Sequence, residues 1–265
     1  MNYARIILWI NKSPYHGYRH QKIWRTDSFT VPHIFSRDIS QAKMIFVVGL
    51  LFTAATLCSS ASQPPRVIVP KNATLANLAW GFNSGGEDNL NGQYVVLVDI
   101  DGVTTEQMTN YKNQGRIVQC YFSVGTAEPW RPDFNKSTWD PLAVGTLPQF
   151  SNEFWLDLTQ LPLIEALMGP RFTRAKKMGC DAIEADNTDC YDNSECNNPI
   201  VKKHPGTDVK ALDIEFCRWL VHTAHQLGLS ISLKNSIEII PDLVDIYDFA
   251  GASDLGVYRY LKKMT

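Results

Sequence analysis

Short apolar runs alternate with amphipathic stretches from Leu78 onward, and this alternation constrains the fold more than any other feature of the chain. Strands are expected over Tyr94–Ile100, Arg116–Val124, Phe154–Leu158, Cys180–Ala185, Leu229–Leu233 and Tyr247–Ala250. Helices are expected over Thr104–Gln114, Leu161–Lys177, Ala211–Leu227 and, in shorter form, Ile237–Ile246. Repeated strand–helix alternation predicts an α/β fold with a parallel sheet, arranged as a (β/α)8 barrel or as a doubly wound sheet.

Polar residues gather where the expected strands end. They are Asp99, Asp101, residues 123–128, Asp157, residues 184–189, Lys234 and Asn235. In a (β/α)8 barrel these ends converge on one mouth, which holds the active site. A single polar residue there would be an ordinary helix cap, but the same arrangement on five strands favours a TIM barrel with a functional mouth. Glycine-rich phosphate-binding motifs are absent from the sequence, which leaves a phosphate-binding metabolic barrel without support.

Composition narrows the function classes. The chain has 265 residues, 45% of them hydrophobic, so it can bury a substantial core. Its 25 basic and 27 acidic residues give a net charge of −2, and no basic run with interleaved aromatic residues indicates a nucleic-acid partner. The six histidines show no metal-ligand spacing. We therefore expect no nucleic-acid partner, no metal and no cofactor.

The N-terminal region contains a targeting pattern. Ile45–Leu57 is an apolar run that follows Lys43 and precedes small residues up to Ala61, as in a secretory signal peptide. We expect a signal peptide over 44–61, a non-native extension over 1–43, a linker over 62–77 and the folded domain over 78–265. The product would be secreted or associated with a cell wall, with no stable membrane partner. A short type II membrane anchor is the alternative.

Glycosylation sites and cysteines fit the secretory interpretation. Asn72 and Asn135 begin Asn-x-Ser/Thr triplets. Cys190 and Cys196 lie six positions apart in a turn-rich segment, so a disulfide between them is expected in an oxidising compartment. The remaining three cysteines of the domain, Cys120, Cys180 and Cys217, lie in apolar runs and are expected to be buried thiols.

Four segments, in order, resemble glycoside hydrolase family 114. They are residues 120–125 (CYFSVG), 128–133 (EPWRPD), 184–189 (EADNTD) and 228–235 (GLSISLKN). The resemblance covers about Trp80 to Phe249. This family consists of TIM-barrel endo-α-1,4-polygalactosaminidases, and some members carry the label α-galactosidase. The resemblance implies hydrolysis of α-linked galactosamine or galactose polymers, so that the expected partner is a carbohydrate polymer.

The residues are suited to this chemistry, because glycoside hydrolysis needs two carboxyl groups. Asp186 is expected to be the nucleophile or stabilising carboxylate, and Glu184, on the same face of the strand, to orient it. Substrate contacts are expected from carboxylates, aromatic faces and the polar residues beside them. These are Asp99, Asp101, Tyr121, Glu128, Trp130, Arg131, Asp157, Asn187, Asp189, Lys234 and Asn235. Lys234 or Arg131 would also hold the carboxylates in place.

The resemblance stops after Ala250. The family continues there into a block with a glutamate, where this chain has Ser253, and then into a final barrel strand. The second catalytic carboxylate and the last strand are therefore expected to be missing, unless Glu128, Asp99 or Asp157 reaches across the mouth. Two hypotheses follow: a secreted glycosidase, or a catalytically impaired barrel that binds carbohydrate.

Overall fold

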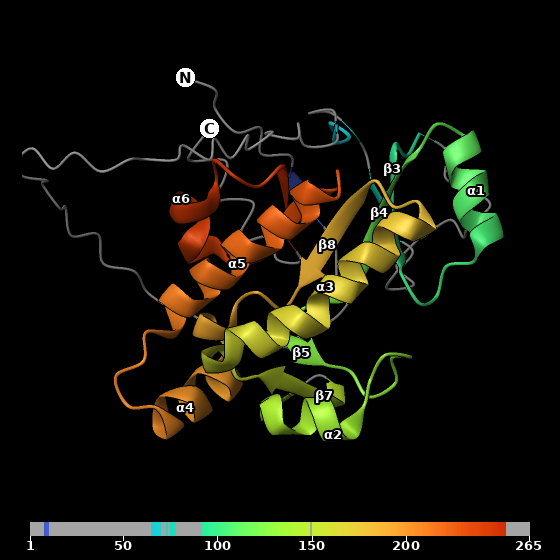
Figure 1. Ribbon diagram of the computed structural model, residues 1–265. Helices are drawn as coiled ribbons and strands as arrows, with labels where there is room; N and C mark the ends of the chain where they lie inside the picture. Colours follow the sequence, from blue (N-terminus) through green and yellow to red (C-terminus); the bar gives the residue numbers. More distant parts are fainter. Residues whose placement is uncertain are drawn as a thin grey trace, which may run out of the picture. The chain divides into compact units, whose positions relative to one another are not determined.

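The computed structural model describes residues 8–10, 65–69, 73, 75–77, 92–148 and 150–252 (Figure 1). All of these residues belong to one compact unit. The expected signal peptide, the glycosylation site at Asn72 and the position of Ser253 lie outside the described residues. Within the described ranges, no helix is long and apolar enough to cross a membrane.

Seven parallel strands form the larger sheet, in the order β1-β10-β9-β8-β4-β3-β2. Their bounds are β1 Leu8–Ile10, β2 Leu75–Asn77, β3 Val95–Asp99, β4 Ile117–Ser123, β8 Ala182–Asp186, β9 Ser230–Lys234 and β10 Phe249–Ala252. From β2 to β10 these strands lie side by side in chain order, as in a (β/α) barrel. The predicted α/β class with a parallel sheet is confirmed. Among the described strands β1 and β2 are the two edges, and closure into a barrel stays a prediction.

Two edge strands come from segments for which no strand was expected. Strand β2, in the segment 62–77 interpreted as a linker, pairs with β3 through Leu75 and Val95. Strand β1, in the segment 1–43 interpreted as a non-native extension, pairs with β10 through Leu8 and Ala250. The sheet therefore continues past β10, where the family resemblance left it without a last strand. Three-residue strands without alternating polarity leave no clear signal in a sequence.

Helices follow the strands and begin and end at recognisable signals. The α-helices are α1 Thr105–Asn113, α2 Lys136–Trp139, α3 Leu161–Met178, α4 Ser194–Lys203, α5 Val209–Gln226 and α6 Ile240–Leu243. The 3-10 helices among the described residues are η1 Asp140–Leu142, η2 Leu158–Gln160, η3 Cys190–Asp192 and η4 Ile237–Ile239. Thr104 and Gln107 form a capping box at α1, and α3 ends at Gly179 with a φ of 93°.

The two faces of the larger sheet contact different apolar clusters. Alternate residues such as Val118, Phe122 and Ile183 pack beneath the helices, together with Phe172 of α3 and Leu220 of α5. On the opposite face, a separate apolar cluster lies at the amino ends of the strands. Its members are Val69, Val95, Ile117, Ala182 and Phe249. Because side chains alternate between faces, residues two and four positions further along these strands continue the second face toward the carboxyl ends.

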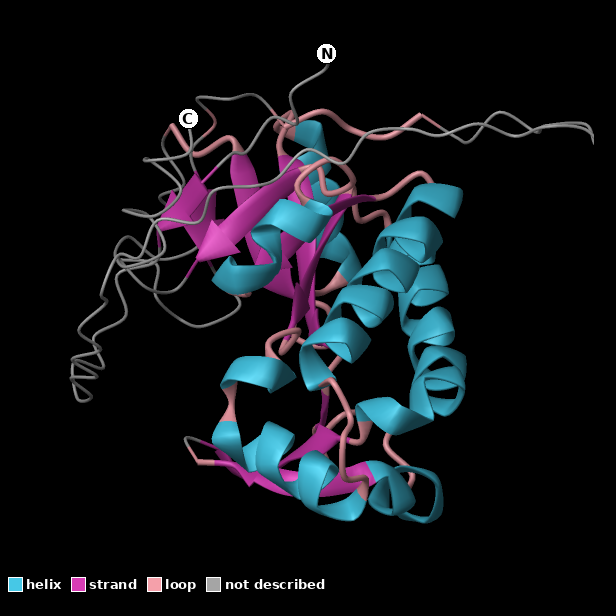
Figure 2. Ribbon diagram, turned by 90° about the vertical axis from the view of Figure 1, so that its left-hand side faces the viewer, coloured by secondary structure: helices cyan, strands magenta, loops and turns pink. Residues whose placement is uncertain are grey.

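A second, smaller sheet is antiparallel and has the order β5-β7-β6. Its strands are β5 Thr126–Ala127, β6 Ala143–Leu147 and β7 Phe150–Leu156. Figure 2 shows it with short helices beside one end of the larger sheet. The prediction that Phe154–Leu158 is a strand of the parallel sheet was wrong. Most of that segment lies in β7, which pairs antiparallel with β5, the short strand that follows β4 in the chain. The periodicity of a strand does not specify which other strand it pairs with.

Two disulfides join the described cysteines. The predicted Cys190–Cys196 bond is confirmed, and it links η3 to the first turn of α4. The prediction that Cys120 and Cys180 are separate buried thiols was wrong, since they are bonded. Strands β4 and β8 are neighbours, with Gln119 opposite Ala182, so Cys180 reaches Cys120 from just before β8. Cys217 is the described cysteine that stays free, and it is buried as expected.

The two disulfides should differ in their contribution to stability. Cys120 and Cys180 are 60 positions apart and Cys190 and Cys196 are 6 apart. The entropy of closing these loops predicts losses of about 4 and about 2 kcal/mol in the free energy of unfolding. Denaturant unfolding of the paired Cys120→Ala/Cys180→Ala and Cys190→Ala/Cys196→Ala proteins tests this order. Equal losses, or the reverse order, would contradict it.

Candidate functional site

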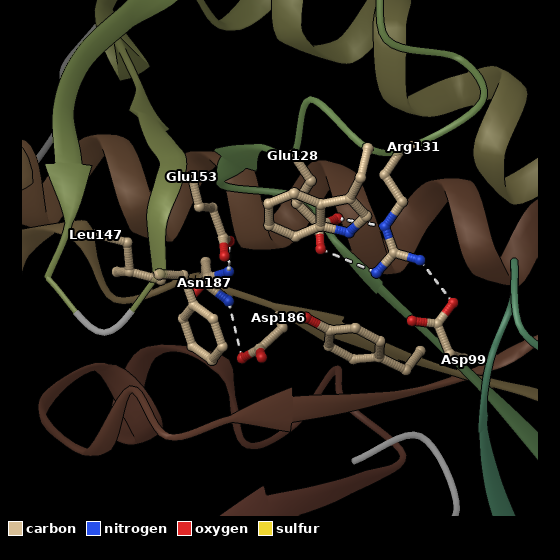
Figure 3. A pocket seen from close by; sticks show the side chains of 10 residues that line it. Asp99, Glu128, Arg131, Leu147, Glu153, Asp186 and Asn187 are labelled. Atoms are coloured by element: carbon tan, nitrogen blue, oxygen red, sulfur yellow. Dashed lines mark hydrogen bonds and ion pairs between the residues drawn. The ribbon is translucent and has the colours of Figure 1, made fainter. Parts of the chain in front are cut away.

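A pocket lies at the carboxyl ends of the parallel strands, and the smaller sheet forms one of its walls. It is lined by Asp99, Tyr121, Glu128, Trp130, Arg131, Leu147, Phe150, Glu153, Asp186 and Asn187 (Figure 3). Strands β3, β4 and β8 supply its floor, whereas β6 and β7 supply Leu147, Phe150 and Glu153. Six of the eleven predicted substrate contacts line this pocket, and so does Asp186 of the predicted catalytic pair.

Asp186 and Glu184 lie on one face of β8, as alternation along the strand predicts. Lys234, at the end of β9, has its Nζ 3.2 Å from Glu184 Oε1 and 3.8 Å from Asp186 Oδ2. All three side chains are buried. Burial raises the pKa of Glu184, although Lys234 opposes the shift. Asp186 lines the pocket and Glu184 does not, so Glu184 and Lys234 support Asp186 from below.

Arg131 holds three carboxylates on the other side of the pocket. Its Nε and Nη2 donate to the two oxygens of Glu128 at 2.8 and 2.9 Å. Its Nη1 donates to Asp99 at 2.6 Å and to Asp101 at 3.0 Å. Burial raises the pKa of Glu128, and the Arg131 hydrogen bonds oppose that shift. Asp99 and Glu128 line the pocket already paired, whereas Asp101 lies behind them on the guanidinium.

Glu153 enters the pocket from the middle of β7 and is 4% exposed. Its Oε1 accepts hydrogen bonds from the Thr126 hydroxyl and, at 3.2 Å, from the Asn187 side-chain amide. Burial, with the charges of Glu128 and Asp186, raises the pKa of Glu153 to about 7, although the Thr126 hydrogen bond opposes the shift. Asn187 also donates its backbone N–H to Asp186 Oδ1 at 2.9 Å. Asn187 therefore connects the two carboxylates, as Figure 3 shows.

Aromatic side chains complete the pocket. Trp130 and Phe150 are 54% and 47% exposed although they line it. Tyr121 is buried on β4, with the Arg131 guanidinium 5.8 Å from its ring centroid. Exposed rings at the rim of a polar pocket are suited to contact with the apolar face of a sugar.

Five residues predicted to contact substrate do not line the pocket in the structure: Asp101, Asp157, Asp189, Lys234 and Asn235. Asp101 pairs with Arg131, and Lys234 lies near Glu184 and Asp186. The placement of Asp157 at the mouth was wrong. It is fully buried, caps η2 through the Thr159 N–H at 3.1 Å and pairs with Lys203 at 2.8 Å. Burial acts to raise the pKa of Asp157, but the hydrogen bonds from Lys203 and Thr159 outweigh it and lower the pKa. The antiparallel pairing of β7 directs this end of the strand toward α4 instead.

Asp189 and Asn235 follow β8 and β9 in their loops. Burial, together with the charge of Asp186, raises the pKa of Asp189 to about 7. Asn235 has a φ of 52° at the turn after Lys234. Both residues lie outside the pocket lining, while the Lys234 ammonium group lies 3.8 Å from Asp186.

Sequence reasoning missed Glu153 and Arg171, and it placed Thr126 among the polar residues at strand ends without giving it a role. Glu153 directly precedes the apolar residues Phe154–Leu156 in β7, and a charged residue beside this run was the available signal. Arg171, buried on α3, donates to the Ser123 carbonyl at 2.7 Å and to both oxygens of Asp133. It thereby ties α3 to the end of β4 and to the loop that carries Arg131. Within the described ranges, no cluster of His, Cys, Asp or Glu is arranged to hold a metal ion.

Gly125 permits the close approach of the two sheets. A Cβ at this position would lie 1.7 Å from the backbone oxygen of Asn187. Gly125→Ala should therefore displace the β4–β5 turn from Asn187 and lower the free energy of unfolding by about 1–3 kcal/mol. Gly169→Ala in α3 is the matched control, because nothing lies within 4 Å of its Cβ position. Equal stability of the two variants in denaturant unfolding would contradict this prediction.

Glu153 should make stability depend on pH. Its pKa rises from 4.5 to about 7 on folding, so the folded protein binds more protons between these values. The free energy of unfolding should fall as pH rises through this window, and Glu153→Gln should remove that fall. The variant should gain up to about 3 kcal/mol relative to the parent between pH 4.5 and 8. Denaturant unfolding across this range, with the exposed Glu106→Gln as control, measures the effect. If the free energies of unfolding of Glu153→Gln and the parent differed by the same amount at every pH, this prediction would be wrong.

Comparisons with known proteins show the family of the chain. The sequence profile of Glycoside-hydrolase family GH114 matches residues 58–264. Ega3 from Aspergillus fumigatus, solved in complex with galactosamine, is 26% identical, with a TM-score of 0.59 over 77% of this chain and 74% of that one. The glycoside hydrolase domain of PelA from Pseudomonas aeruginosa is 16% identical, with a TM-score of 0.53 over 69% and 67%. The latter similarity concerns the fold. No curated protein matches the chain.

Proposed function

Because the chain belongs to glycoside hydrolase family GH114, we propose that it hydrolyses α-linked galactosamine or galactose polymers with Asp186 as the catalytic carboxylate. The observation that carries this proposal is the position of Asp186, which ends β8 inside the pocket with Lys234 3.8 Å away. The complex of Ega3 with galactosamine supports the choice of sugar. A closed barrel is part of the proposal, since the strands from β2 to β10 follow chain order.

Asp186 would attack or stabilise the anomeric carbon as positive charge develops there. Burial acts to lower the pKa of Lys234, but Asp186 and Glu184 outweigh it and raise the pKa, so Lys234 stays charged. This ammonium group faces both carboxylates and places a positive charge 3.8 Å from Asp186 Oδ2. Glu184 is the positioning residue, because its Oε1 holds Lys234 at 3.2 Å.

The proton donor is the second group that the reaction requires. Of the three alternatives considered from the sequence, Asp99 and Glu128 are held by Arg131 and Asp157 lies outside the pocket. The family position occupied by Ser253 is outside the described residues. These facts also support a second candidate function, in which the chain binds the same carbohydrate without cleaving it.

The substrate side of the pocket fits a sugar chain. Trp130 and Phe150 offer exposed rings, and Asp99, Glu128, Glu153 and Asp186 offer acceptor oxygens. Secretion agrees with the two disulfides, which persist in oxidising compartments. Asn135 is exposed, and its side chain caps α2. It remains the proposed glycosylation site within the described residues.

Replacement of Asp186 tests the proposal. Asp186→Asn preserves shape but removes the charge, so the release of reducing ends from partly deacetylated galactosaminogalactan should fall by about a thousandfold or more. The exposed Asp140→Asn is the control and should hydrolyse the polymer like the parent. Binding is measured beside hydrolysis by calorimetry. Saturable binding without hydrolysis by the parent would favour the second candidate, and normal hydrolysis by Asp186→Asn would remove Asp186 from the reaction.

A further inference from the structure

The carboxylates that line the pocket differ in how their charge is balanced. Arg131 pairs with Asp99 and Glu128, and Lys234 lies 3.8 Å from Asp186. Glu153 also lines the pocket, but among the described residues it forms no ion pair within 4 Å. Buried charges in proteins are normally paired. A cation brought by the ligand would complete this pattern.

The geometry of Glu153 leaves room for such a cation. Its Oε1 accepts from Thr126 and Asn187, which are both neutral donors. Its Oε2 accepts no hydrogen bond from any residue that the structure describes, and the carboxyl group borders the pocket. One oxygen is thus fixed by the protein, and the other is available to a ligand in the cavity.

Asn187 places this carboxyl group beside Asp186. Its backbone N–H donates to Asp186 at 2.9 Å, and its side-chain amide donates to Glu153 at 3.2 Å. In galactosamine the amino group is on the carbon next to the anomeric carbon. When the anomeric carbon of the sugar lies against Asp186, its amino group is therefore also close to Asp186. Glu153 is held in the same part of the pocket.

We propose that Glu153 binds the protonated amino group of a galactosamine unit and makes the pocket selective for the free amine. The inference rests on the proposed function, which supplies the sugar and its position against Asp186. An ammonium group donates charged hydrogen bonds to Oε2 and balances the buried carboxylate. The hydroxyl of galactose supplies no positive charge, and the acetamido group of N-acetylgalactosamine supplies a neutral donor with added bulk.

Proton release gives the inference an independent signature. The groups that face Glu153 are Asp186 and Glu128, which favour its protonated form, and Arg131 and Thr126, which favour its charged form. With a pKa of about 7, Glu153 carries a proton in most free molecules at pH 6. A bound ammonium group favours the carboxylate, so binding of the amino sugar at pH 6 should release a proton.

Calorimetric titration of the 265-residue chain tests the inference without requiring catalysis. The probes are methyl α-galactosaminide, methyl α-galactoside and methyl N-acetyl-α-galactosaminide, each in two buffers of different ionisation enthalpy. The parent should bind the free amine at least about tenfold more tightly than the other two, with proton release. Glu153→Gln should lose this preference and the proton release, and should bind the galactoside within about twofold of the parent. The exposed Glu106→Gln should behave like the parent.

Glu153→Asp guards against a purely structural explanation. It keeps the charge one methylene further back, so part of the amine preference should survive, provided circular dichroism shows a native fold. Unchanged preference in Glu153→Gln, or equal loss of affinity for all three sugars, would overturn the inference. So would unchanged binding with abolished hydrolysis, which would make Glu153 the proton donor. A parent that binds the amine selectively but does not hydrolyse polymer would support the inference and refute the proposed function.

Discussion

The two-residue alternation of side chains along the parallel strands is the constraint on which the site depends. On the face that points away from the helices, Ala182, Glu184 and Asp186 follow one another along β8. That face is apolar where the strands begin, polar in the middle, where Gln119 donates to Ser232 at 2.9 Å, and charged where they end. The other face stays apolar because helices cover it. The apolar residues that stabilise the fold and the charged residues of the pocket therefore lie on different faces or at different ends of the same strands.

Contact between the two sheets sets the spacing of the pocket. Asn187 adopts a φ of 63°, which asparagine tolerates better than most residues, and follows Asp186 directly. Its amide reaches Ser123, Thr126 and Glu153, so it ties β8 to the turn between β4 and β5 and to β7. Gly125 makes the approach possible, because its backbone N–H lies 3.4 Å from the Asp186 carbonyl with no side chain between. A loop residue thus fixes carboxylates that come from different sheets.

Cations divide the carboxylates of the site into two groups. Arg131 is buried and donates four hydrogen bonds to Asp99, Asp101 and Glu128, so this cluster holds three carboxylates in fixed positions. Arg171 holds the loop that carries Arg131 through Asp133. Lys234 instead serves the pair on β8. Glu153 borders the same cavity and forms no ion pair within 4 Å among the described residues, which is the observation behind the proposal of a cationic sugar.

The sequence by itself determined the parts of the protein that depend on local order. Strand periodicity placed Glu184 and Asp186 on one face of β8, turn residues located α1, α3 and α5, and a six-residue spacing gave the Cys190–Cys196 bond. Tertiary structure alone decided which strands are neighbours. Long-range pairing brought Cys180 to Cys120, gave the sheet β1 and β2 as edges, and moved β7 into an antiparallel sheet. The antiparallel pairing of β7 placed Asp157 beside Lys203 and Glu153 in the pocket with Asp186. The sequence could not determine this, because strand partners depend on packing across the whole chain, whereas periodicity describes only the alternation of side chains within one segment.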